Sequence, residues 1–183
     1  AEMIGSYHGE ALQTRGMLVK TLFRSIVGQQ VSVKAADTVW NRMEQLLGEV
    51  NPANILGVEP EKLQKCGLSH RKVEYLLEIS QHSSELEKTD WGSMNDDDSI
   101  ERLCQIRGVG RWTAEMLLIF NLMRPDIFPL GDIGLVRAIE KNYNEGNELS
   151  KQELTEISKN WKPWRTAATW YLWRSLDPLP VEY

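Results

Sequence analysis

The sequence lacks most features that would set it apart from ordinary globular proteins. Only two of its 183 residues are cysteine, too few for a four-cysteine zinc or iron–sulfur site, and we interpret both as reduced thiols of an intracellular protein. Apolar runs such as 116–120 fall far short of the roughly 20 residues that span a bilayer, and charged residues interrupt the first apolar stretch, unlike a secretory signal. We therefore expect one domain over residues 1–183 without a membrane segment.

Basic charge is not in excess either. The chain has 21 Lys and Arg against 26 Asp and Glu, a net charge of −5. Phosphate contacts usually come from basic groups, so this total argues weakly against nucleic-acid binding. A net charge does not describe local patches, however. Much of the acidic charge falls between Glu85 and Glu101, which is typical of a solvated surface.

Period-two alternation is missing as well, and helical periodicity takes its place. It is clearest over residues 17–27, 33–47, 73–79, 111–123, 133–143 and 165–175. Residues 98–101 resemble a cap before a short helix that ends near Ile106, and Ser150 to Glu153 form a capping-box pattern. We predict an all-α fold of about nine or ten short helices. The segment 89–98 is the best candidate for a boundary between two lobes.

The most informative block is residues 103–114, Leu-Cys-Gln-Ile-Arg-Gly-Val-Gly-Arg-Trp-Thr-Ala. Gly108 and Gly110 lie between two predicted helices, where glycine permits a tight turn and close approach of the backbone to a ligand. Amide groups at the start of the second helix, together with the helix dipole, attract a phosphate. Such a loop would bind a DNA backbone without any lysine. A plain corner between helices needs the same glycines, so this block alone leaves both interpretations open.

A wider pattern resembles the helix-hairpin-helix (HhH-GPD) DNA glycosylase superfamily, and within it the alkylbase, 3-methyladenine DNA glycosylase II type. The resemblance covers about residues 17–176. The segments that carry it are 26–32, 67–72, 103–114, 130–137 and 161–165. It implies a two-lobed helical fold with a DNA cleft between the lobes. The amino-terminal sheet domain of some alkylbase glycosylases is not expected here.

The resemblance implies an enzyme of base excision repair that acts as a monomer on double-stranded DNA containing damaged bases. It would hydrolyse the N-glycosidic bond of alkylated purines, of the 3-methyladenine and 7-methylguanine class. The expected location is the cytoplasm or nucleoid of a bacterium, or the nucleus of a eukaryote. The alternatives are a catalytically silent helix-hairpin-helix DNA-binding protein, a glycosylase for oxidised or deaminated bases, and an all-α scaffold without a nucleic-acid role.

Asp132 is the catalytic candidate. By pattern alone, an aspartate before an apolar helical run is usually an N-cap, and the two roles are compatible because a capping carboxylate is held rigidly. Cleavage of a glycosidic bond builds positive charge on the sugar. A fixed carboxylate stabilises this charge and orients or deprotonates the attacking water. An alkylated purine already carries positive charge and leaves readily, so one carboxylate is enough.

The predicted base pocket consists of Trp112, Met116 and Trp173. An electron-rich indole face favours a cationic base that has been flipped out of the stack, although core packing remains the competing interpretation for each residue. Trp112 also stands where related enzymes that cut the DNA strand carry a lysine. Because an indole is not a nucleophile, the chain is expected to have no lyase activity.

The remaining predicted roles concern contact with DNA. Residues 28–32 resemble an intercalating loop with Gln30 as the wedge, where relatives often carry a bulkier apolar side chain; ordinary loop polars and a helix cap at Ser32 are the alternatives. Residues 67–72 would contact a second phosphate, or are simply an exposed basic helix start. The predicted DNA contacts are Gln29, Gln30, Ser32, Ser69, Arg71, Lys72, Gly108, Val109, Gly110, Arg111 and Thr113.

No cofactor is expected to be required, and the three histidines lack the spacing of metal ligands. The resemblance implies a structural Na⁺ or K⁺ held by the backbone oxygens of Cys104, Ile106 and Val109. The sequence departs from the family at Arg107, where relatives frequently carry proline. This change either loosens the hairpin or adds a phosphate contact.

Overall fold

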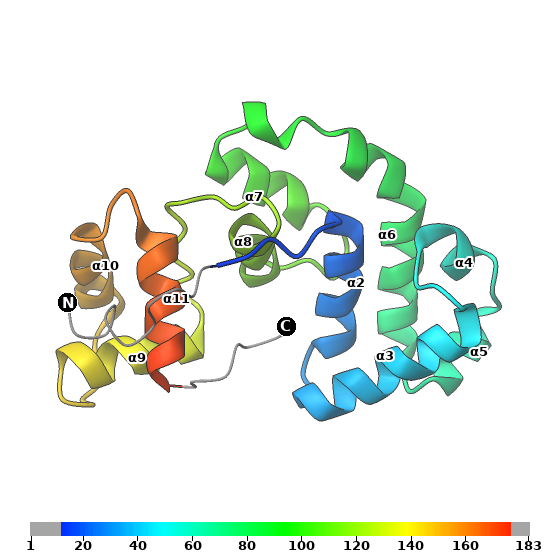
Figure 1. Ribbon diagram of the computed structural model, residues 1–183, viewed down its shortest axis with the longest axis horizontal. Helices are drawn as coiled ribbons and strands as arrows, with labels where there is room; N and C mark the ends of the chain where they lie inside the picture. The colour runs from blue at the N-terminus through cyan, green and yellow to red at the C-terminus, as the bar shows by residue number, and fades with distance from the viewer. Residues whose placement is uncertain (1–11, 177–183) are drawn as a thin grey trace. The chain divides into compact units, whose positions relative to one another are not determined.

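The computed structural model describes residues 12–176, and every regular element in this range is helical. This confirms the all-α prediction. No helix in the same range is long and apolar enough to cross a membrane. The α-helices (Figure 1) are α2 (Leu18–Gly28), α3 (Val33–Leu47), α4 (Pro52–Leu56), α5 (Pro60–Lys65), α6 (His70–Lys88), α7 (Asp96–Cys104), α8 (Arg111–Phe120), α9 (Ile133–Tyr143), α10 (Lys151–Lys159) and α11 (Arg165–Leu176). A 3-10 helix, η1 (Trp91–Ser93), precedes α7.

The described chain forms two compact units, and the division falls inside helix α8. Residues 15–117 make the N-terminal unit, and residues 118–176 with 12–14 make the C-terminal unit. The segment 89–98, where the sequence suggested a lobe boundary, lies within the N-terminal unit. It is ordered there by local caps, because Asp90 caps η1 and Asn95 caps α7.

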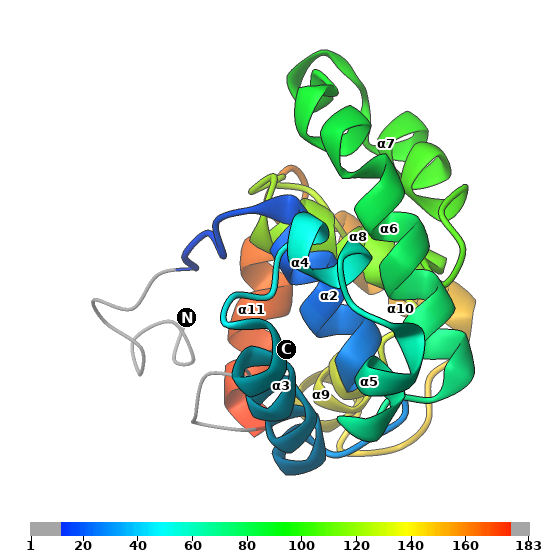
Figure 2. The ribbon, with the colours of Figure 1, turned by 90° about the vertical axis from the view of Figure 1, so that its right-hand side faces the viewer.

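The N-terminal unit is organised around α6. Helix α2 packs along α6, and the short helices α4 and α5 cover other parts of it (Figures 1 and 2). Leu22, Phe23 and Ile26 of α2 and Leu76 and Ile79 of α6 are completely buried. Burial of such side chains stabilises the fold by about 1.5–3 kcal/mol each. The periodicities read over 17–27 and 73–79 therefore correspond to real core faces.

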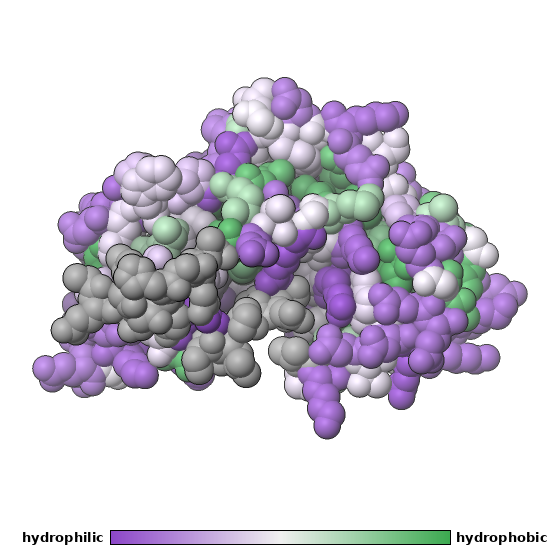
Figure 3. Space-filling view, in the orientation of Figure 1, coloured by the Kyte–Doolittle hydropathy of each residue, from purple (hydrophilic) through white to green (hydrophobic). Residues whose placement is uncertain are grey.

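Helix α3 has one buried side and one hydrophilic side. Its inward side buries Trp40 and Met43, whereas Figure 3 shows mostly hydrophilic side chains over its outer side. Ser32 caps this helix by accepting a hydrogen bond from the Ala35 N–H. This confirms the capping interpretation of Ser32.

The C-terminal unit is built on the packing of α9 against α11. Leu135, Ala138 and Ile139 of α9 and Leu172 of α11 are buried. Helix α10 begins with the predicted capping box, in which the Ser150 hydroxyl and the Glu153 carboxylate satisfy each other's backbone amides.

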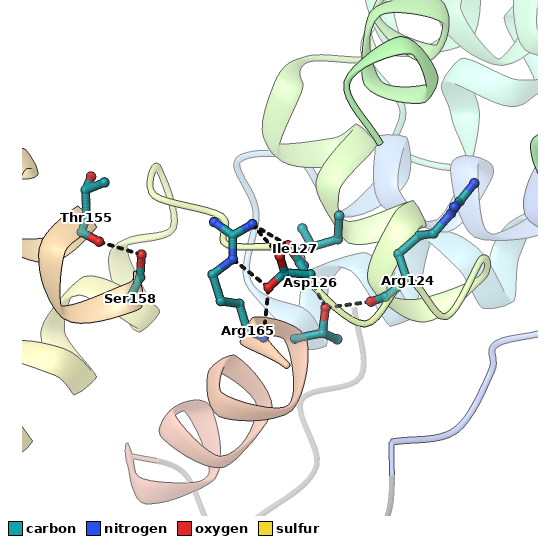
Figure 4. Close-up of polar contacts among 7 residues, drawn as sticks. Arg124, Asp126, Ile127, Thr155, Ser158 and Arg165 are labelled. Carbon is teal, nitrogen blue, oxygen red and sulfur yellow. Dashed lines mark hydrogen bonds and ion pairs between the residues drawn. The ribbon is translucent and has the colours of Figure 1, made fainter. Parts of the chain in front are cut away.

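The loop before α9 is anchored to the start of α11 (Figure 4). Arg165 donates from Nε to Oδ1 of Asp126 at 2.7 Å and from a terminal nitrogen to Oδ2 at 2.9 Å. These hydrogen bonds hold the pKa of the Asp126 carboxyl below its usual value. The Thr166 hydroxyl donates to the Arg124 carbonyl at 2.6 Å and accepts from the Ile127 N–H at 3.0 Å. The chain that leads to Asp132 is thus held at a defined place.

Two helix boundaries differ from the sequence prediction. Helix α8 ends at Phe120 instead of Met123, because Met123 takes a left-handed conformation (φ 52°) and the Arg124 N–H turns back to the Leu118 carbonyl. Helix α7 begins at Asp96, because its cap is Asn95, whose side chain accepts the Asp98 N–H at 2.9 Å. Both predicted boundaries were wrong by a few residues.

Candidate functional site

Asp132 lies at the N-cap of α9, as the sequence predicted. Its Oδ1 accepts the Leu135 N–H at 2.6 Å, and the residue is only 6% exposed. The residue itself has extended backbone angles, φ −80° and ψ 113°, which is the conformation of a capping residue. The fold therefore fixes this carboxylate by the same contact that starts the helix.

A second donor reaches the same oxygen. The indole Nε1–H of Trp173 donates to Oδ1 of Asp132 at 2.9 Å. The Trp173 ring is stacked on Phe120, with 5.9 Å between ring centroids and an interplanar angle of 14°. The sequence had assigned Trp173 to the base pocket, and its hydrogen bond to Asp132 was not foreseen. Contact of Trp173 with a base stays a prediction.

Gly134 makes room for this pair. A Cβ atom at position 134 would lie 3.2 Å from Oδ1 of Asp132 and 3.7 Å from Cδ1 of Trp173. Any side chain there would press on the carboxylate or the indole. Sequence reasoning missed Gly134, although a glycine two residues after the candidate aspartate, inside a predicted helix, was the available signal.

The turn that follows α2 is strained at its tip. Gln29 has φ −56° and ψ 127°, Gln30 has φ 57°, and the Val31 N–H bonds to the Gly28 carbonyl at 3.4 Å. These values fit a type II turn, whose third position favours glycine. A glutamine in the left-handed region is uncommon and often marks a functional position. Gln30 is exposed at this tip, as a wedge requires.

A cavity of about 350 Å³ lies beside this turn. Its lining consists of Arg24, Ser25, Val27, Gly28, Gln29, Gln30, Val31, Ala36, Asp37 and Trp112. Trp112 is half-buried and forms part of the wall. Met116 does not line this cavity and is only 5% exposed, within the core. Of the two pocket candidates in the N-terminal unit, Trp112 therefore borders this cavity and Met116 does not.

The hairpin is the turn between α7 and α8, residues 105–110. Its two glycines are needed for different reasons. Gly108 has φ 88°, and a Cβ atom there would lie 2.3 Å from the ring of Tyr75. Gly110 has no atom within 4 Å of the corresponding position. The first glycine permits the turn and its packing, and the second leaves open space above the backbone. Helix α8 starts directly afterwards, so the amides of its first turn have no helical acceptors.

Some of the other predicted DNA contacts have exposed side chains, and others have buried side chains. Arg71 and Arg111 are exposed, and Arg111 donates to Glu115 at 3.0 Å. Ser69 is exposed and caps α6 through the Lys72 N–H. The side chains of Val109 and Thr113 are buried, so only their backbone groups remain for contact with DNA.

Lys72 and Gln29 are engaged with the protein itself. The Lys72 ammonium donates to the carbonyls of Val27 and Gln29, both at 2.8 Å. Burial lowers the pKa of Lys72 below its usual value. The Gln29 side-chain amide donates to the Gly108 carbonyl at 2.9 Å. The sequence predicted a phosphate contact for Lys72 and placed Gln29 in the intercalating loop, and it did not foresee these bonds.

The described residues contain no cluster of three or more His, Cys, Asp or Glu side chains that suits a metal ion. In the hairpin, the Ile106 carbonyl accepts the Val109 N–H at 3.0 Å, and a carbonyl oxygen keeps a second lone pair after one such bond. The cation site at the oxygens of Cys104, Ile106 and Val109 stays a prediction.

Comparison with known proteins identifies one family. The sequence profile of the HhH-GPD superfamily of base excision DNA repair proteins matches residues 23–163. A putative DNA-3-methyladenine glycosylase of Bacillus subtilis, YfjP, is 32% identical over 166 residues, which cover 85% of this chain and 58% of the relative. The chain thus spans little more than half the length of that protein.

Two solved structures have similar folds. DNA-3-methyladenine glycosidase of Bacillus halodurans has a TM-score of 0.82 and 36% identity, over 92% of this chain and 79% of the other. The 3-methyladenine DNA glycosylase Mag1 of Schizosaccharomyces pombe, solved in complex with abasic DNA, has a TM-score of 0.80 and 32% identity. That match covers 98% of this chain and 89% of the other.

Proposed function

The chain belongs to the HhH-GPD superfamily of base excision DNA repair proteins, and on this basis we propose that it is a monofunctional DNA glycosylase for alkylated purines. The observation that carries the proposal is the rigidly held carboxylate of Asp132, with the Leu135 amide and the Trp173 indole both on Oδ1. A silent DNA-binding protein needs the hairpin but has no use for an oriented carboxylate.

Asp132 acts on the sugar. As the bond to the damaged purine lengthens, the sugar approaches an oxocarbenium ion, and the negative carboxylate stabilises it without having to reorient. The purine leaves with the electron pair of the broken C–N bond, which neutralises its positive charge. Water adds to the anomeric carbon and transfers a proton to Asp132 as general base. The products are a free base and an abasic site.

DNA recognition is assigned to the N-terminal unit. Backbone amides at the start of α8 bind a phosphate of the DNA, with Arg111 and Arg71 as positioning charges. Gln30 enters the stack where the damaged nucleotide has left it. The flipped base is read by stacking on Trp112, beside the 350 Å³ cavity.

The absence of lyase chemistry is part of the proposal. It rests on Trp112, an indole where a strand-cutting enzyme would need an amine nucleophile. The test is treatment of the reaction mixture with borohydride, which traps a Schiff base between enzyme and DNA. Free base released without any trapped complex is the expected result, and a trapped complex contradicts it.

The main test is release of base from DNA treated with a methylating agent, compared with undamaged DNA and with DNA containing oxidised or deaminated bases. Release of methylated purines supports the proposal. Release of oxidised or deaminated bases alone would favour the other glycosylase type, and salt-dependent binding without any release would favour the silent binding protein.

We further propose that the enzyme acts as a monomer inside the cell, where its DNA substrate is, and that hydrolysis requires no cofactor. A Na⁺ or K⁺ at the hairpin carbonyls would act on DNA affinity alone. Exchange of Na⁺ or K⁺ for a bulky organic cation at equal ionic strength tests this, and a real site predicts weaker DNA binding after the exchange.

A further inference from the structure

Helix α6 carries three polar side chains along one face, and each meets a loop of the proposed DNA interface. Lys72, Tyr75 and Glu78 are spaced three residues apart, which makes them neighbours on the helix surface. The Tyr75 ring lies directly beneath Gly108. Glu78 accepts the Arg107 N–H at 3.3 Å and pairs with the Arg107 guanidinium at 3.8 Å. Tyr75 and Glu78 thus anchor the hairpin.

Lys72 anchors the other loop, the turn of residues 28–31. Helix α2 ends at Gly28, and the carbonyls at a helix end lack helical donors and attract a cation. The Lys72 ammonium has three donors and uses two of them on the carbonyls of Val27 and Gln29. Two of its three donors are therefore directed at the base of this turn.

Gln29 connects the turn to the hairpin through hydrogen bonds. Its side chain donates to the Gly108 carbonyl at 2.9 Å, while its own carbonyl accepts from Lys72 at 2.8 Å. One residue thereby links the turn that carries Gln30 to the hairpin. All of these groups lie within the N-terminal unit. We call Lys72, Tyr75, Glu78 and Gln29 the loop-anchoring network.

We propose that Lys72 and Gln29 are positioning residues, which hold the Gln30 wedge at a fixed distance from the phosphate bound by the hairpin. This rests on the proposed function, since it takes Gln30 as the wedge and the hairpin as the phosphate site. The wedge must enter the base stack at a set spacing from that phosphate, and a displacement of about 1 Å is enough to lower a rate about a hundredfold. Lys72 acts through Gln30 instead of through DNA.

The experiment compares Lys72→Met and Gln29→Met, which keep side-chain length but remove the donors, with Arg71→Met, which removes a neighbouring exposed charge. The first measurement is the salt dependence of binding to an abasic-site duplex. The second is the fluorescence of a 2-aminopurine placed opposite the abasic site, which reports wedge insertion without chemistry. The third is the rate of base release at saturating protein.

For Lys72→Met we expect an unchanged salt slope, a reduced insertion signal and a rate lowered about tenfold or more, because the wedge is no longer held in place. Gln29→Met should show the same pattern. Arg71→Met should instead reduce the salt slope by about one, as loss of a phosphate contact does. A Lys72→Met protein with the smaller salt slope and full insertion would overturn the proposal.

Thermal unfolding of each variant shows whether the variant is still folded. If Lys72→Met does not unfold cooperatively, Gln29→Met decides, and full insertion by that variant overturns the proposal. The insertion signal also separates the two levels of inference. A wild-type protein that inserts but releases no base would contradict the proposed function, while the insertion signals of Lys72→Met and Gln29→Met would still decide on the network.

Discussion

Trp173 donates its indole N–H to the same carboxylate oxygen of Asp132 that caps helix α9. The two partners are 41 residues apart in the chain and both are buried. The carboxylate is thus oriented from two sides, by its own helix and by α11. This arrangement gives Asp132 a structural role beside the chemical role that we propose for it, and mutations can separate the two.

Asp132→Asn separates them most directly. Asparagine caps helices about as well as aspartate, so the free energy of unfolding should change little. Loss of the negative charge next to the cationic sugar should lower base release by about a hundredfold or more. Single-turnover assays on methylated DNA measure this loss, and full activity would remove Asp132 from its role.

Trp173→Phe removes the indole donor and keeps an aromatic ring against Phe120. We expect about a tenfold lower rate of base release, because the carboxylate loses one of the bonds that orient it. Trp170→Phe, a change of the same kind on the same helix, is the control and should have a smaller effect. Equal rates for the two variants would show that the hydrogen bond is unimportant.

Gln30→Gly should raise stability and lower activity together. Glycine accepts a positive φ without strain, so unfolding should require about 0.5–1 kcal/mol more. The same change removes the wedge, so binding to abasic-site duplex should weaken. Chemical denaturation and binding titrations measure the two effects, and a variant that is neither more stable nor weaker in binding would contradict both parts.

Gly108→Ala and Gly110→Ala should fail in different ways. An alanine at 108 would clash with Tyr75 and sit in a left-handed conformation, so we expect a loss of about 1–3 kcal/mol of stability. At 110 the added methyl meets open space, so the fold should remain intact while DNA binds more weakly. Calorimetry and DNA titration should therefore rank the two variants in opposite order.

Asp126→Asn should make stability less dependent on pH. Arg165 holds the pKa of Asp126 below its usual value, so the stabilising contribution is complete above the unfolded-state pKa of about 3.9 and is lost as pH falls through the lower folded-state pKa. Wild type should exceed the variant by about 1–3 kcal/mol near pH 7, and the gap should narrow below about pH 4. Glu148→Gln, at an exposed position, is the control and should show no such gap.

Caps and periodicity made much of the fold predictable. Helix α9 begins after Asp132 and α10 after Ser150, as their cap residues indicated. The end of α8 was missed because a methionine, not a glycine, takes the left-handed position there. The start of α7 was missed because Asn95 and Asp98 are both good caps, and sequence alone does not choose between them.

The site was predictable in its residue types but less so in its partners. Motifs pointed to Asp132, Trp173 and Lys72, yet the bonds of Trp173 to Asp132 and of Lys72 to Gln29 join residues 41 and 43 positions apart. A periodic pattern tells which face of a helix is buried but not which distant group it meets. The sequence therefore indicated that Lys72 is a surface cation, whereas in the structure it is partly buried and bonds to two backbone carbonyls.

The open backbone at Gly110 has a consequence for regulation. Cells commonly weaken the hold of proteins on DNA by acetylating lysines, which removes their charge. A main-chain amide offers no side chain for such an enzyme and does not titrate at physiological pH. The part of the proposed phosphate contact that the amides supply would therefore stay constant where a contact made by lysines would be lost on acetylation.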